Sequence, residues 1–207
     1  MRKVLILLTL WAFIPVGCVH FRTVSTDIAP TAANPLKYPA RMGIYFSPKL
    51  PKCVVARKPD TMYGARHEYR YEWGPSLQAA LTRSVQAAYS DVTVANGPPR
   101  PGEFDRVIAF DLSKVDLIVE FVPGYLRQEA KANASITVSL EIFDGKTMDS
   151  LKTLPVTGKG ASAEDASGFT PYASKHFTEA MEIAIQQLSE IVSNLLISGA
   201  AEPWKKR

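Results

Sequence analysis

Few side chains in this sequence have the chemistry of catalysis or metal binding. The 207-residue chain contains three histidines, His20, His67 and His176, and two cysteines. They are too few for a zinc site built from several Cys and His ligands. The sequence motifs of serine hydrolases and zinc proteases are missing, and so are the glycine-rich loops that bind nucleotide phosphates. We therefore expect no enzymatic activity, no cofactor and no metal, and we expect each histidine to be packed or solvated.

Three acidic residues suggest a different chemistry. Asp105, Asp111 and Asp116 lie on or beside neighbouring predicted strands. Carboxylates that meet in space can bind cations or act as acids and bases. The alternative is that they occupy exposed strand faces and strand ends, which is where charged residues usually lie. We expect the second arrangement.

Cys18 stands at the end of a segment with a distinctive order. A short basic start, Met1–Lys3, precedes the uncharged apolar stretch Val4–Val16, and the small residue Gly17 stands directly before the cysteine. This order is typical of a secretory signal. The apolar stretch is shorter than the roughly 20 residues that a membrane-spanning helix needs. A short transmembrane anchor is the alternative.

The residues Pro15–Cys18 resemble the lipobox of bacterial lipoproteins at Gly17 and Cys18, and depart from it at Pro15, where leucine is usual. The resemblance implies that residues 1–17 are a lipoprotein signal peptide, and that Cys18 carries diacylglycerol and an N-acyl chain such as palmitate. Several acyl chains give durable membrane attachment. Val19 follows the cysteine where an aspartate would retain the protein, which implies the periplasmic side of the outer membrane. Ordinary secretion with an unmodified Cys18 is the alternative.

The charge and composition exclude some classes of protein. Of the 24 basic residues, two lie within residues 1–17, so 22 basic and 20 acidic residues remain after it. This balance is too small to suggest a nucleic-acid-binding protein without a clustered basic face. The chain is 46% hydrophobic and 21% charged, which is typical of a globular domain with its own core.

Alternating apolar and polar residues predict several strands. The clearest covers residues 132–142, and residues 151–160 are its expected antiparallel partner across the turn at Asp144–Lys146. The other predicted strands are 42–47, 52–57, 67–73, 91–95, 106–112 and 115–122.

Two amphipathic helices are predicted. The first opens at Gly74–Ser76 and repeats apolar or small residues every three or four positions up to Ala88. The second runs from Thr170 to about Ser198 and is closed by Gly199. The order of elements predicts an α+β fold, in which a mainly antiparallel sheet carries both helices on one face.

The domain organisation follows from the composition along the chain. Residues 18–39 are rich in small polar residues and contain three prolines, which predicts a polar tether behind the lipidated cysteine. Residues 40–199 form a single periplasmic α+β domain, and residues 200–207 form a basic tail.

The segment 57–73 combines basic and aromatic residues, which are the types that anchor protein interfaces. The candidate partner-binding residues are Arg66, Tyr69, Arg70, Tyr71 and Trp73. Basic side chains there could also contact the phosphate of an anionic lipid. The alternative is that the three aromatic residues only cover the helices.

The layout from the lipobox at Cys18 to the closing helix resembles small bacterial outer-membrane lipoproteins, most closely the YajG-like lipoproteins and the ABC-type transport auxiliary lipoproteins. The resemblance implies a non-enzymatic adaptor or accessory subunit of a larger periplasmic or outer-membrane assembly or transport machine. Its partners would be the membrane, through the anchor, and an envelope protein, but no nucleic acid. The alternative is a periplasmic carrier that binds a lipid or small ligand in a groove between sheet and helices.

Overall fold

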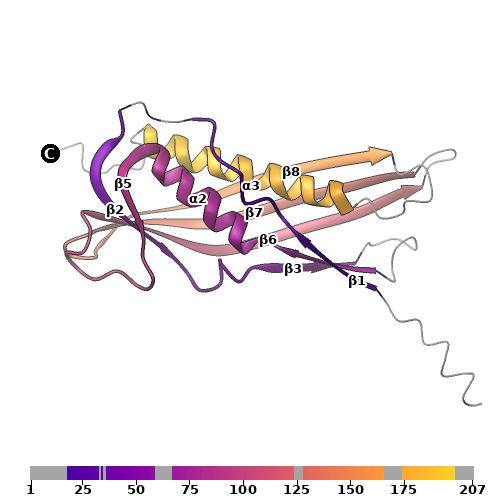
Figure 1. The fold of residues 1–207 in the computed structure, drawn as a ribbon, viewed down its shortest axis with the longest axis horizontal. Coiled ribbons are helices and arrows are strands. Elements are labelled where there is room, and N and C mark those ends of the chain that lie inside the picture. Colours follow the sequence, from indigo (N-terminus) through magenta and orange to yellow (C-terminus); the bar gives the residue numbers. More distant parts are fainter. Residues whose placement is uncertain are drawn as a thin grey trace, which may run out of the picture.

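The computed structural model describes residues 18–32, 34, 36–58, 67–123, 128–165 and 174–198. These residues form eight strands and two helices, labelled as in Figure 1. The signal peptide predicted at residues 1–17 and the basic tail predicted at residues 200–207 lie outside the described residues.

The larger sheet has five strands in the order β5-β2-β6-β7-β8. Its strands are β2 (Tyr38–Phe46), β5 (Tyr89–Val94), β6 (Arg106–Pro123), β7 (Gln128–Asp144) and β8 (Ser150–Asp165). The last three form an antiparallel meander, which confirms the predicted hairpin, whereas β2 pairs in parallel with both β5 and β6. The α+β class is confirmed, but the sheet is mixed rather than mainly antiparallel.

The smaller sheet has three strands in the order β1-β4-β3. They are β1 (Cys18–Thr23), β3 (Val54–Arg57) and β4 (His67–Glu72). β1 pairs in parallel with β4, and β4 is antiparallel to β3. The two sheets meet where Arg57 Nε donates a hydrogen bond to the Leu117 carbonyl oxygen of β6, at 2.9 Å.

The long strand β6 replaces the two strands that the sequence predicted in this region. Its pairing with β7 shifts between Leu112 and Lys114, as expected of a β-bulge. The extra residue shifts the alternation of residues between the two faces of the strand. Even-numbered residues such as Ile108 face the helices before the shift, and odd-numbered residues such as Leu117 face them after it. The bulge therefore keeps Ile108, Phe110, Leu117 and Val119 on the helix-covered face on both sides of the shift.

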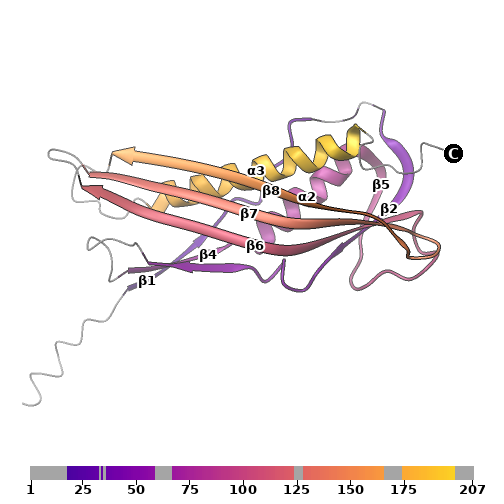
Figure 2. The ribbon, with the colours of Figure 1, turned by 180° about the vertical axis from the view of Figure 1, so that it is seen from behind.

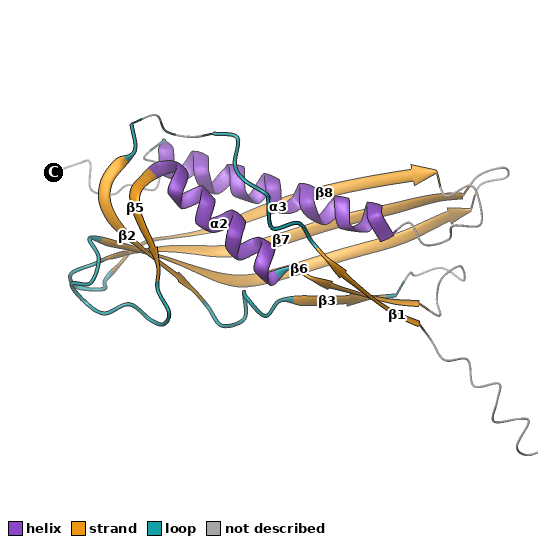
Figure 3. Cartoon of the chain, viewed as in Figure 1, coloured by secondary structure: helices purple, strands orange, loops and turns teal. Residues whose placement is uncertain are grey.

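Helices α2 (Gly74–Ala88) and α3 (Ser174–Ile197) cover one face of the larger sheet, as predicted (Figure 3). α3 packs on β7 and β8, and α2 packs on α3 and β5. The opposite face of β6, β7 and β8 carries no helix of the described chain (Figure 2). The hydrophobic core lies between the larger sheet and the helices, and the buried residues of the smaller sheet, such as Tyr69 and Tyr71, belong to it.

Small residues bring α3 very close to β8. A Cβ atom placed on Gly158 would lie 2.1 Å from the Ala184 carbonyl oxygen, and one placed on Gly160 would lie 2.1 Å from the Ala180 carbonyl oxygen. Neither position can therefore carry a side chain unless the helix moves.

The prediction that residues 18–39 form a polar tether is wrong for most of the segment, because these residues belong to the folded domain. Residues 18–23 form β1, and residues 24–32, here called the strap, run across both helices (Figure 1). Val24 and Ile28 of the strap are buried.

Side chains of the helices hold the backbone of the strap. Ser76 Oγ of α2 donates to the Val24 carbonyl at 2.8 Å, and Ser193 Oγ of α3 donates to the Ala32 carbonyl at 3.1 Å. Arg83 Nη1 donates to the carbonyls of Thr26 and Ile28. The composition of the segment suggested solvation, but its carbonyl groups find donors in the protein.

Candidate functional site

Cys18, the predicted lipidation site, is the first residue of β1. It lies opposite His67 in the parallel pairing with β4. No spacer therefore separates the predicted attachment point from the folded domain. The lipid itself remains a prediction.

Three candidate partner-binding residues are core residues, which corrects the prediction made for them. Tyr69, Tyr71 and Trp73 are each at most 1% exposed. The Tyr69 ring packs edge-on against Phe177 of α3, with 5.7 Å between the ring centroids. The alternative reading, in which these aromatic residues cover the helices, describes the structure. Arg66 lies outside the described residues.

Burial also changes the acid–base behaviour of Tyr71. Desolvation, together with the neighbouring Tyr69, raises the pKa of the Tyr71 hydroxyl far above its ordinary value, and Arg22 opposes this only in part. The phenol therefore stays neutral, as expected of a core residue rather than of a general base.

The outer face of the smaller sheet is formed by the residues that alternate with these buried ones. It carries Val19 and Phe21 of β1 beside Glu68 and Arg70 of β4. Phe21 is 66% exposed. The Arg70 guanidinium lies 5.8 Å from the centre of the Phe21 ring, and its Nε donates to Glu68 Oε1 at 2.7 Å. Arg70 is thus the one described candidate that stays at the surface.

Sequence reasoning missed Val19 and Phe21. The alternation of Val19, His20, Phe21 and Arg22 is a strand signal, but it fell inside the segment interpreted as a tether.

The histidines do not form a hydrolase site among the described side chains. The His20 ring stacks on Tyr69 at 5.2 Å. His176 Nδ1 lies 3.2 Å from Glu179 Oε2 and 3.5 Å from Ser162 Oγ. A catalytic triad needs one ring nitrogen on the serine and the other on the acid, whereas here the same nitrogen faces both.

Glu179 has a second partner in this network. Ser162 Oγ donates to Glu179 Oε2 at 2.8 Å, and this hydrogen bond, more than His176, lowers the pKa of the Glu179 carboxyl. The serine hydroxyl is therefore engaged with a carboxylate whose lowered pKa makes it a weak base.

The three aspartates do not converge. Asp105 accepts a hydrogen bond from the Arg41 backbone N–H at 2.9 Å, and Asp116 forms an ion pair with Arg57 at 3.5 Å. Within the described residues, no three His, Cys, Asp or Glu side chains are placed to hold a metal.

Cys53 is a half-buried free cysteine that packs against the core. Burial raises the pKa of its thiol. A protonated, partly buried thiol is a poor nucleophile, so this cysteine behaves as a small apolar side chain.

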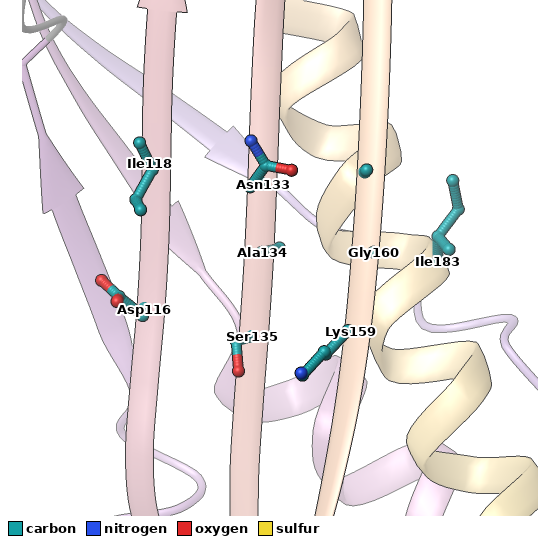
Figure 4. Close-up of a pocket in the computed structure, with 9 residues that line it drawn as sticks. Asp116, Ile118, Asn133, Ala134, Ser135, Lys159, Gly160 and Ile183 are labelled. Atoms are coloured by element: carbon teal, nitrogen blue, oxygen red, sulfur yellow. The ribbon is translucent and has the colours of Figure 1, made fainter.

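The uncovered face of the larger sheet carries a shallow depression with a volume of about 440 Å³ (Figure 4). Its lining combines polar and apolar side chains from three strands and α3. The lining includes Asp116, Ile118, Asn133, Ser135, Lys159 and Ile183. Opposite charges therefore flank an apolar and amide-bearing floor.

The depression reaches the free edge of β8. The Lys159 backbone N–H donates a hydrogen bond to Gln187 Oε1 of α3 at 2.6 Å. This N–H group therefore points away from β7. In an antiparallel strand every second residue points the same way, so the N–H groups of Ala161 and Ala163 also face the edge. Both residues are exposed. Pro155 belongs to the same alternating set of residues but has no N–H group. The part of the β8 edge with available N–H groups is therefore its C-terminal end, at Ala161 and Ala163.

A second, smaller depression of about 290 Å³ lies on the same face, near the turn between β7 and β8. Tyr45, Phe143 and Met148 line it together with Asp111 and Glu141. Met148 has a φ of 62°, a backbone conformation that residues with side chains rarely adopt.

Neither described helix is long and apolar enough to cross a membrane.

Comparison of the sequence with known proteins found no match: no protein-family model and no curated protein resembles the chain closely enough.

Solved structures do resemble it. A Xanthomonas campestris protein of the DUF330 family has a TM-score of 0.52 and 11% identity, over 88% of this chain and 98% of its own. A Helicobacter pylori protein described as a neuraminyllactose-binding hemagglutinin homolog has a TM-score of 0.53 and 13% identity, over 89% and 97%. A minor lipoprotein from Acinetobacter baumannii has 10% identity over 80% and 96%, but its TM-score of 0.43 is too low to carry an argument. At these identities the first two comparisons show the fold alone: the chain has an α+β fold that also occurs in other bacterial proteins.

Proposed function

We propose that the chain is a non-enzymatic lipoprotein of the bacterial cell envelope that acts as an adaptor or accessory subunit of a larger assembly or transport machine. Its relatives in function would be the YajG-like and ABC-type transport auxiliary lipoproteins. In this proposal Cys18 carries the acyl chains and holds the domain at the periplasmic side of the outer membrane.

The observation that carries the proposal is the open end of the β8 edge beside the depression. An extended segment of a partner can add to a free strand edge through main-chain hydrogen bonds, while pockets beside the edge select its side chains. Ala161 and Ala163 offer the backbone groups, and the depression next to them offers Lys159 and Asp116 for charged side chains.

A carrier function with a ligand between sheet and helices is less well supported. Along β8 this space is closed, because Gly158 and Gly160 lie against the backbone of α3. A ligand there would have to separate the helix from the sheet.

The test is site-specific photo-crosslinking of the full-length protein in membranes of its native host. A photoreactive residue replaces Ala163 at the open edge of β8, and a matched control replaces Thr93, an exposed residue of the edge strand β5. We expect a single envelope protein, identified by mass spectrometry, to be crosslinked from position 163 but not from position 93. Equal labelling from both positions would contradict the assignment of the edge.

A backbone variant then tests how the partner binds. Ala161→Pro removes one outward N–H group from the edge, where proline is tolerated, whereas Ala161→Ser keeps it. Capture of the partner should be lost with Ala161→Pro and retained with Ala161→Ser. Recovery of lipid without any protein partner would favour the carrier instead.

A further inference from the structure

We infer that the outer face of the smaller sheet lies against the membrane, with the Phe21 ring in the phospholipid head-group layer and Arg70 at a lipid phosphate. The inference rests on the proposed anchoring of Cys18, and it assigns the orientation of the domain on the bilayer.

Phe21 lies only three residues after Cys18 in β1. Strands rise about 3.3 Å per residue, so Phe21 lies roughly 10 Å along the strand from Cys18. The head-group region on each side of a bilayer is roughly 5–8 Å thick. Since β1 begins at Cys18 without a spacer, only a strand that stands nearly upright on the bilayer could carry Phe21 beyond the head-group layer.

Exposed apolar side chains lie on the part of the outer face that is close to Cys18. Val19 is 46% exposed and Phe21 is 66% exposed, and they share the outer face, while His20 between them turns inward onto Tyr69. Exposed apolar and aromatic side chains beside a membrane anchor are stabilised by insertion at the interface. Val54 of β3 is 53% exposed and lies on the same face, opposite Glu72 of β4.

A cationic side chain, Arg70, lies next to the Phe21 ring. Glu68 occupies Nε of Arg70 and holds the guanidinium over Phe21. Within the described part of the chain the Nη groups of Arg70 make no hydrogen bond, and guanidinium donors match phosphate oxygens. Glu72, the other acidic residue of this face, lies opposite Thr23, farther from Cys18. Arg70 therefore lies between its partner Glu68, which is nearer to Cys18, and Glu72, which is farther from it.

The test uses the full-length lipidated protein in vesicles of phosphatidylethanolamine and phosphatidylglycerol that carry head-group quenchers. Phe21→Trp reports on the outer face, and Val94→Trp, at an exposed position of β5 at the far end of the molecule (Figure 1), is the matched control. The unsubstituted protein gives the background of its own tryptophans. We expect a blue shift and loss of most of the added emission for Phe21→Trp, and neither change for Val94→Trp.

Adding Arg70→Gln to Phe21→Trp should weaken the quenching in vesicles that contain phosphatidylglycerol. Unchanged quenching would overturn the role of Arg70. Mass spectrometry of Cys18 separates the two proposals. If Cys18 is lipidated and residue 21 stays in water, this inference alone is overturned. If Cys18 is unmodified, the anchoring and the inference are overturned together. Crosslinking of residue 21 to a protein in place of lipid would also overturn it.

Discussion

The two faces of β8 are packed in opposite ways, although they are contributed by alternate residues of the same strand. On the helix side, Gly158 and Gly160 leave no room even for a methyl group beneath α3. On the other side, Lys159 lines a depression of about 440 Å³. The helix side therefore tolerates almost no change in volume, while the uncovered side is free to bind.

The smaller sheet repeats this difference with aromatic residues. Tyr71 is fully buried, whereas Phe21, on the opposite face of the same sheet, is 66% exposed. Aromatic character does not decide which residue is available for contact. The face of the strand decides it.

The largest expected effect comes from placing a side chain on the packed face. Gly160→Val should destabilise the protein by about 3 kcal/mol, because the new atoms overlap the Ala180 carbonyl of α3. Urea unfolding of the purified protein measures the change.

The matched control is Ala161→Val, one residue along on the uncovered side, where Ala161 is exposed. It should change the free energy of unfolding by no more than about 0.5 kcal/mol. Equal destabilisation by both substitutions would show that the two faces do not differ as described.

A smaller effect is expected in the buried contact between the helices. Ser84 Oγ and Ser189 Oγ lie 2.8 Å apart, and Ser84 Oγ also donates to the Ala80 carbonyl. Ser84→Ala should cost about 1 kcal/mol, since it leaves Ser189 with a poorer partner. In a double-mutant cycle measured by thermal unfolding, Ser84→Ala with Ser189→Ala should cost less than the sum of the single changes. Strict additivity would mean that the two hydroxyls do not interact.

The strap offers a local test of how the helix side is covered. Arg83→Gln removes the donor to the carbonyls of Thr26 and Ile28, so amide hydrogen exchange should accelerate in residues 24–32 while β7 stays protected. Arg100→Gln, a change at an exposed position outside the strap, should leave the exchange of the strap unchanged. Acceleration throughout the molecule would mean that the strap does not open on its own.

The smallest effect is expected from exposed carboxylates. The Arg41 backbone N–H lowers the pKa of Asp105, and the backbone N–H groups of Lys146 and Thr147, with Arg106, lower that of Asp144. Because the folded pKa lies below the unfolded value of about 3.9, their contribution is present above that value and lost as pH falls through the folded pKa. Acid titration of unfolding should show a shallower loss for Asp105→Asn than for the unsubstituted protein. An identical slope would exclude Asp105 from the effect.

Much of the local structure could be predicted from residue patterns. The alternation in residues 132–142 lies inside β7, and the apolar repeat after Gly74 coincides with α2. Both patterns depend on neighbours in the sequence. These patterns did not predict the bulge in β6. The shift in the apolar alternation near Leu112 is the pattern expected where one strand ends and another begins.

The candidate site was predicted only in part. The alternation of residues 67–73 predicts two faces, but local sequence does not say which one is covered. Tyr69, Tyr71 and Trp73 are therefore predicted at the surface with Arg70, although they are buried. Phe21 was missed because its partner strand lies far away in the chain.

Local sequence thus sufficed for the existence and type of most elements, since helix and strand periodicity are properties of consecutive residues. The tertiary structure alone decided the direction of pairing of β2 with β5 and β6, the burial of the aromatic face and the docking of the strap. The physical reason is that an alternating strand can pair in either direction, with only a small difference in stability per residue. The neighbouring strand with which it pairs depends on contacts between residues distant in the chain. The same holds for the side chains that donate hydrogen bonds to the backbone carbonyls of the strap.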